Sequence, residues 1–178
     1  QDMCTRSGSA LYRRLMVEWD TLGGGTVART LRAWGRHYPV LQGANTPDDV
    51  VERVDRAATP QDQDEVLLAL IELAQDGADL AGRIVVHLML YKVESLAHRT
   101  RGRGEDTMED RRHVALAELW AVVACYPVQR RRSRVAANLA MELLRAVVQP
   151  RHRTPTPQAL REHYEVWLGG PPSDVGDL

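Results

Sequence analysis

The segment 84–91 constrains the fold of this chain most strongly, because a helix formed there would be apolar on almost every side. Its sequence, Ile-Val-Val-His-Leu-Met-Leu-Tyr, is interrupted only by His87. A helix with no polar face belongs in the middle of a bundle. Elsewhere the apolar residues recur at spacings of three and four, and no runs of β-branched and aromatic residues stand between turn signals. We therefore predict an all-α fold, a multi-helix bundle with this segment at its centre.

Capping and turn residues divide the chain into the predicted helices. Thr46-Pro47 and Thr59-Pro60 each place a capping residue before a proline at the first helical position. The triplet Gly23-Gly24-Gly25 lacks the Lys-Ser/Thr of a phosphate loop and is interpreted as a hinge. The pattern predicts helices at about 9–19, from 26 to the residue before Pro39, and from 47. It predicts a helical hairpin at 61–99 that turns at 76–79, followed by a charged loop at 100–108 that we expect to be mobile. Further helices are predicted at about 110–124, 132–148 and 158–167.

Composition excludes several classes of protein. No apolar run reaches the roughly 18 to 20 residues that a membrane span needs. The two cysteines, Cys4 and Cys125, lie far apart and outside any metal-binding motif, so we expect neither a disulfide framework nor a zinc site. Lys92 is the only lysine among 23 basic residues, a skew typical of a GC-rich genome. With no secretory signal in residues 1–9, a cytoplasmic location is expected.

The net charge of −1 conceals two strongly charged segments. Residues 45–79 contain ten acids and two arginines, a charge of −8, whereas residues 99–153 contain twelve arginines and six acids, a charge of +6. Seven of these arginines fall within 130–153, where Glu142 is the only acid. Such a basic segment fits nucleic acid, and it equally fits the acidic segment of a second copy or of another protein.

Only one stretch places residues of catalytic type on one helical face. His87, Tyr91, Glu94 and His98 follow one another at helical spacing, which is compatible with a metal-dependent hydrolase. The two histidines are eleven residues apart, too far for one ion without further ligands. We favour a structural, hydrogen-bonded His87 and a solvated helix end, and therefore predict no enzyme activity, no metal and no cofactor.

A longer stretch resembles a known family. The sequence Ala117-Glu118-Leu119-Trp120, the break at Tyr126-Pro127, and Arg134-Val135-Ala136-Ala137-Asn138-Leu139-Ala140 with Arg145 resemble the second conserved region of bacterial sigma-70-type transcription factors. The hairpin at 67–97 resembles the region that precedes it. The resemblance implies a divergent actinobacterial regulator in which the Glu118 helix faces RNA polymerase and the helix 134–145 faces promoter DNA.

The chain departs from that family in three places. The acid-Gln-Glu cluster usual in the polymerase-facing helix is reduced to Glu118. Ser133-Arg134-Val135 stands where the family carries an aromatic-led sequence that holds an unstacked promoter base. Too few residues follow Arg153 for a promoter-reading domain. We therefore expect a sigma-like core that opens no DNA strands, with three parts: a helical extension at 1–59, the core at 60–149, and a linker, short helix and tail at 150–178.

The arginines that precede and follow the family-like helix are the predicted nucleic-acid contacts. At the start of a helix they would add to the dipole and free amides that already favour phosphate. Trp120 and Tyr126 are interpreted as core anchors, and Asn138 either contacts a base or bonds another helix end. The predicted contacts to DNA are Arg130, Arg131, Arg132, Arg134, Asn138 and Arg145, and the predicted contact to RNA polymerase is Glu118. The alternative is a helical protein-interaction module or a self-associating bundle, a possible homo-oligomer.

Overall fold

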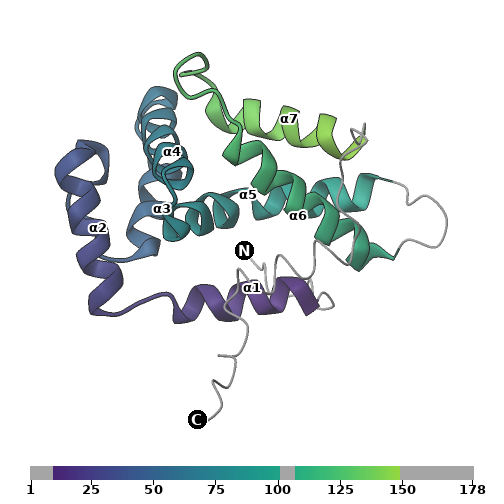
Figure 1. Cartoon of the computed structure of the whole chain (residues 1–178), viewed down its shortest axis with the longest axis horizontal. Helices are drawn as coiled ribbons and strands as arrows, with labels where there is room; N and C mark the ends of the chain where they lie inside the picture. Colours follow the sequence, from purple (N-terminus) through teal and green to yellow (C-terminus); the bar gives the residue numbers. More distant parts are fainter. Residues whose placement is uncertain (1–9, 101–106, 149–178) are drawn as a thin grey trace, which may run out of the picture.

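Seven α-helices and one short 3-10 helix form the part of the chain that the structure, a computed structural model, describes: residues 10–100 and 107–148 (Figure 1). Within those residues there is no strand, so the all-α prediction is confirmed. The elements are α1 (Ala10–Thr21), α2 (Gly25–His37), η1 (Pro39–Leu41), α3 (Pro47–Asp55), α4 (Pro60–Gln75), α5 (Asp79–Arg99), α6 (Met108–Ala124) and α7 (Val135–Val148).

Three helices begin with a complete capping box. In α3 and α4 the predicted threonines, Thr46 and Thr59, accept a bond from the third helical amide, and the acid at that position bonds back to the cap. The same arrangement at Thr107 starts α6 two residues before the predicted Asp110. Each box satisfies amides that would otherwise be left free at a helix start. These boundaries are therefore set by residues that adjoin them in the sequence.

The central hairpin formed by α4 and α5 supplies the core of the bundle. Gly77 has a φ of 90°, the left-handed conformation that the turn between the two helices requires. Helix α5 packs against α3, α4, α6 and α7, and eleven of its residues are buried. The prediction that this apolar segment lies at the centre of the bundle is confirmed.

Helices α1 to α3 pack on that core. One connected hydrophobic cluster extends from Leu11 in α1 to Leu143 in α7 and includes residues on both sides of position 60. A polar contact reinforces the packing: the Trp19 indole N–H donates to Asp48 at 2.9 Å. The division into parts at 1–59 and 60–149 remains a prediction.

Two predictions concern segments that lie wholly or mainly outside the described residues. The charged loop predicted at 100–108 is described only at its ends, where Thr100 follows α5 and Thr107 caps α6. The predicted helix at 158–167 and the tail lie in residues 149–178. In the described part of the chain, no helix is both long enough and apolar enough to cross a membrane.

Candidate nucleic-acid interface

The predicted DNA contacts lie mainly in the connection between α6 and α7, at the edge of the molecule (Figure 1). We call residues 130–134 the arginine loop. The prediction that a helix starts near Arg132 is wrong, since α7 begins at Val135. Consequently all four arginines of the loop precede the helix and are exposed.

The loop backbone is tied to the core of the bundle. The Pro127 carbonyl accepts bonds from the amides of Arg130 and Arg131. The hydroxyl of Tyr126, a residue only 3% exposed, donates to the Arg131 carbonyl at 2.9 Å. Gln75 in α4 donates to the carbonyls of Val123 and Tyr126, both at 2.9 Å. The backbone of the loop is therefore held in one position from which its side chains project.

An acid from another helix occupies the start of α7. The amides of Arg134 and Val135 donate to the two carboxylate oxygens of Asp64, each at 2.7 Å. Arg134 has a φ of 54°, in the left-handed region. This conformation lets the amides of Arg134 and Val135 point toward the same carboxylate, that of Asp64. Asp64 is 7% exposed, so the contact is shielded from water.

The prediction that this helix start offers free amides to phosphate is therefore wrong. A buried carboxylate already neutralises the positive end of the helix dipole and satisfies both amides. Nor does Ser133 cap the helix, because Asp64 in α4 fills that role. With these two amides occupied, we expect the arginine side chains to be the main groups that bind an anion at this surface.

Five predicted arginines fall into two groups by their ion pairs. Arg131 and Arg145 share Glu142, at 2.7 and 3.0 Å, and these hydrogen bonds lower the pKa of the Glu142 carboxyl and raise the pKa of the Arg131 guanidinium. The other three form no ion pair within residues 10–100 and 107–148. These unpaired cations are Arg130, Arg132 and Arg134.

The Asn138 side chain binds the backbone of the arginine loop. Its amide donates to the Ser133 carbonyl at 2.9 Å and lies 3.4 Å from the Tyr126 hydroxyl. Of the two roles considered for Asn138, the structure shows the bond to a neighbouring backbone segment. Tyr126 is buried, and Trp120 packs against the core so closely that a Cβ on Gly82 would lie 2.4 Å from its ring. Both aromatics are core anchors, as predicted.

Glu118 lies on α6, away from these contacts. It is half-buried, and burial raises the pKa of its carboxyl. Within the described residues it forms no ion pair. Its assignment to RNA polymerase remains a prediction.

Comparison with known proteins adds no relative. No family model, curated protein or solved structure matches the chain. The resemblance to the sigma-70 second region stays a prediction that rests on the residues quoted above.

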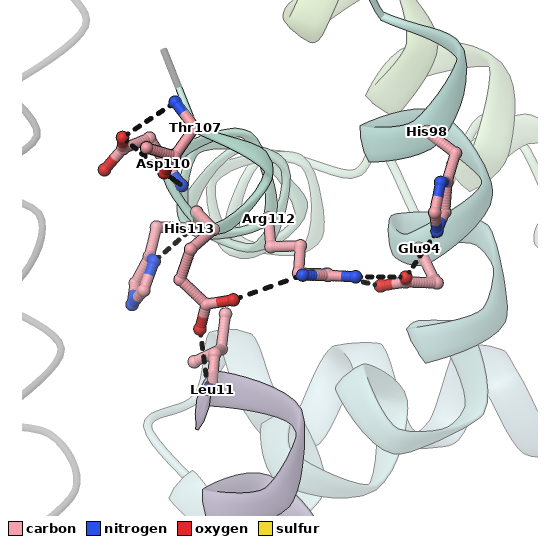
Figure 2. Close-up of polar contacts among 8 residues, drawn as sticks. Leu11, Glu94, His98, Thr107, Asp110, Arg112 and His113 are labelled. Atoms are coloured by element: carbon pink, nitrogen blue, oxygen red, sulfur yellow. Dashed lines mark hydrogen bonds and ion pairs between the residues drawn. The ribbon is translucent and has the colours of Figure 1, made fainter. Parts of the chain in front are cut away.

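The face predicted to carry His87, Tyr91, Glu94 and His98 is divided by the structure. Glu94 and His98 lie 2.8 Å apart, and Arg112 from α6 binds both oxygens of Glu94, at 2.7 and 2.9 Å (Figure 2). Hydrogen bonding to Arg112 is the largest cause of the lowered pKa of the Glu94 carboxyl. Tyr91 is 64% exposed and belongs to a different surface.

Arg112 also connects this cluster to α1. It contacts Glu109 at 3.2 Å, and Glu109 accepts the Leu11 amide at 2.7 Å, at the start of α1 (Figure 2). The cluster thus joins α1, α5 and α6. We interpret it as a structural element, because its carboxylates are already bound by a guanidinium and a helix amide.

His87 was predicted to be held in the core by a hydrogen bond, and the structure shows a different contact. Its ring stacks on the Trp19 indole, with centroids 3.6 Å apart and planes inclined by 16°, so aromatic stacking replaces the expected hydrogen bond within the described residues. Burial lowers the pKa of its imidazole, although nearby acids oppose this effect. No group of three potential metal ligands occurs in the parts of the chain described.

Two surfaces and two positioning residues were not predicted from the sequence. Asp64 and Gln75 reach the α6–α7 connection across about 70 and 50 residues of sequence, so no local signal reveals them. Helix α2 carries exposed arginines at 29, 32 and 36, whose i, i+3, i+7 spacing was visible in the sequence. The other missed surface is an apolar groove beside α7, described below.

Proposed function

We propose that this chain is a non-enzymatic, transcription-related regulator that binds the DNA backbone through its arginine loop, and RNA polymerase through the sigma-like core. One observation carries the DNA part of the proposal. Arg130, Arg132 and Arg134 project from a loop whose backbone is fixed, and none of them has an acidic partner within the described residues. The polymerase part rests on the family resemblance alone.

The arrangement suits contact with phosphates more than reading of bases. A guanidinium donates two parallel bonds to a phosphate, and the fixed backbone lowers the entropy lost when the side chains are ordered. Arg131 and Arg145 add charge once phosphate competes with Glu142 for them. Asn138 is occupied by the loop backbone, which leaves no base-reading amide at this position. We expect binding to DNA of any sequence, without strand opening.

Duplex binding measured against salt concentration tests this proposal. Fluorescence anisotropy with a labelled duplex is recorded between about 50 and 200 mM salt, where each neutralised phosphate contributes about −0.9 to the slope of log K against log salt. The triple variant Arg130→Gln, Arg132→Gln, Arg134→Gln should flatten that slope by about 2 to 3 units. Its helical circular dichroism should remain that of the unmodified chain.

Helix α2 provides a matched control. Replacing Arg29, Arg32 and Arg36 by glutamine removes the same charge from another exposed surface and should leave the slope within about 1 unit of the original. Equal losses in both triple variants would reduce the effect to net charge and contradict the proposal. Absence of duplex binding by the unmodified chain at about 50 mM salt would also contradict it.

A second candidate function, self-association, is favoured by an acidic hollow beside η1, α3 and α4. This hollow has a volume of about 640 Å³ and is lined by Asp49, Glu52, Asp62 and Glu65 together with two arginines. Arg53 and Arg56 are already engaged, by the carbonyls of residues 40 and 42 and by Glu52 respectively. The arginine loop of a second copy would complement its charge. Sedimentation that shows dimers, lost in the arginine-loop variant, would favour this candidate over DNA.

A further inference from the structure

An apolar groove with a volume of about 610 Å³ lies beside α7. One wall is α5 and the other is α7, and residues from the end of α3 and the first half of α4 also line the groove. The groove includes none of the arginine-loop residues. It is therefore a separate surface from the proposed DNA contact.

The α7 wall is built from small and apolar side chains in helical register. Ala136, Ala140 and Leu144 follow one another at intervals of four, so they form one stripe about 12 Å long. Alanine side chains allow another backbone to approach closely. A second helix of about two turns matches the length of this wall.

Large apolar side chains remain exposed at the groove. Among the described residues only Val17, Tyr91, Met141 and Val148 are large, apolar and at least half exposed, and two of these line the groove. Tyr91 is 64% exposed on the α5 wall and Met141 is 50% exposed on the α7 wall. Apolar residues gathered on one concave surface are typical of an interaction site.

The α5 wall adds a charge pattern. Lys92 and Arg99 are exposed, two helical turns apart, and neither forms an ion pair within the described residues. Asp55, the last residue of α3, lines the groove and carries the opposite charge. The side-chain amide of Gln63 already donates a hydrogen bond to the Val54 carbonyl. The groove is thus an apolar channel with two cations along one side that form no ion pair in the described residues. One of them, Lys92, lies 5.7 Å from the centroid of the Tyr91 ring.

We infer that this groove binds an amphipathic helix of a partner protein, with acidic residues on the flank that faces α5. The apolar residues of that helix, at positions i, i+4 and i+7, would lie between Tyr91 and Met141. Its acids would pair with Lys92 and Arg99. The two helical walls and the length of the alanine stripe favour a helix over an extended peptide.

A pair of synthetic peptides tests the inference on the full chain. The first is a labelled helical peptide of about 16 residues with leucines at i, i+4, i+7 and i+11 and glutamates on one flank. The second carries lysines in place of the glutamates. Anisotropy should show a dissociation constant on the order of 10 μM for the acidic peptide and at least about tenfold weaker binding of the basic one.

Variants locate the binding. Met141→Gln should weaken binding of the acidic peptide by about fivefold or more, whereas Val17→Gln, the same kind of change on α1, should not. Replacing Lys92 and Arg99 by glutamine should abolish the preference for the acidic peptide. Equal binding of both peptides, or an unaffected Met141→Gln variant, would overturn the inference.

Two other occupants would also overturn it. Dimers in sedimentation that disappear in Met141→Gln would identify a second copy in the groove. Peptide binding that requires prior replacement of Leu160 and Trp167 by glutamine would identify a segment of the chain itself as the occupant.

Discussion

Two clusters of arginine and glutamate in this molecule have similar pairing and opposite surroundings. In the first, Arg112 and Glu94 have side-chain exposures of 16% and 12% and join two helices. In the second, Arg131 and Arg145 share Glu142 and are 44% and 63% exposed. An ion pair in water contributes little, whereas a buried pair cannot lose one partner without leaving an uncompensated charge.

This difference in exposure assigns a structural role to the Glu94 cluster and leaves the Glu142 cluster as the candidate for binding. The Glu94 cluster is fully engaged within the bundle, where it also reaches the start of α1 through Glu109. The Glu142 cluster stands at the surface beside three arginines that lack acidic partners in the described residues. Its guanidiniums are free to exchange a carboxylate for a phosphate at small cost in stability.

The largest expected effect comes from breaking the buried pair. Arg112→Ala should lower the free energy of unfolding by about 3 kcal/mol, because Glu94 would remain buried without its partner. Arg145→Ala, the matched change in the exposed cluster, should lower it by about 0.5 kcal/mol or less. Urea denaturation measures both. Similar losses in the two variants would erase the distinction between the clusters.

A smaller loss is expected when the acid that caps α7 is removed. Asp64→Ala leaves the Arg134 and Val135 amides without their acceptor and should cost about 2 kcal/mol. Thr59→Ala, which removes an exposed local cap, should cost about 1 kcal/mol. If Asp64→Ala proved the milder change in the same denaturation experiment, the start of α7 would not depend on α4.

The pH dependence of stability should report on the Glu94 cluster. Hydrogen bonding to Arg112 lowers the pKa of Glu94 in the folded state, so the unfolded chain binds the proton more readily. The stabilisation is therefore complete above the unfolded pKa, near 4.5, and is lost as the pH falls through the lower folded value.

Unfolding free energies of the unmodified chain and of Glu94→Gln, measured from pH 6 to pH 3, test this expectation. The difference between the two proteins should be constant near pH 6 and should shrink below about pH 4.5. A difference that grows as the solution is acidified would contradict the assigned sign.

Local signals in the sequence predicted most of the fold. Thr46 and Thr59 mark helix starts because a capping box needs only residues that are close in sequence. The apolar segment 84–91 predicted the central helix because its periodicity leaves no polar face. Both kinds of evidence lie within a few turns of the position they determine.

The start of α7 could not be predicted in the same way. The three residues 132–134 have no local feature that excludes them from a helix, and the acid that fixes the boundary lies 71 positions from Val135. Asp64 lies just after the first turn of α4, which contains Asp62, and acids are common near helix starts. The arginines were found by composition, but their availability depends on tertiary contacts.

The proposed function requires that guanidinium groups of the arginine loop bind phosphate while Asp64 keeps the Arg134 and Val135 amides. A titration of the ¹⁵N-labelled chain with duplex DNA, followed by nuclear magnetic resonance, tests it most directly. We expect the side-chain Nε–H signals of Arg130, Arg132 and Arg134 to shift, while the Val135 amide keeps its chemical shift and its protection from exchange. A shifted Val135 amide signal with unchanged arginine signals would contradict phosphate binding by the guanidinium groups, because phosphate would then have replaced Asp64 at the helix start.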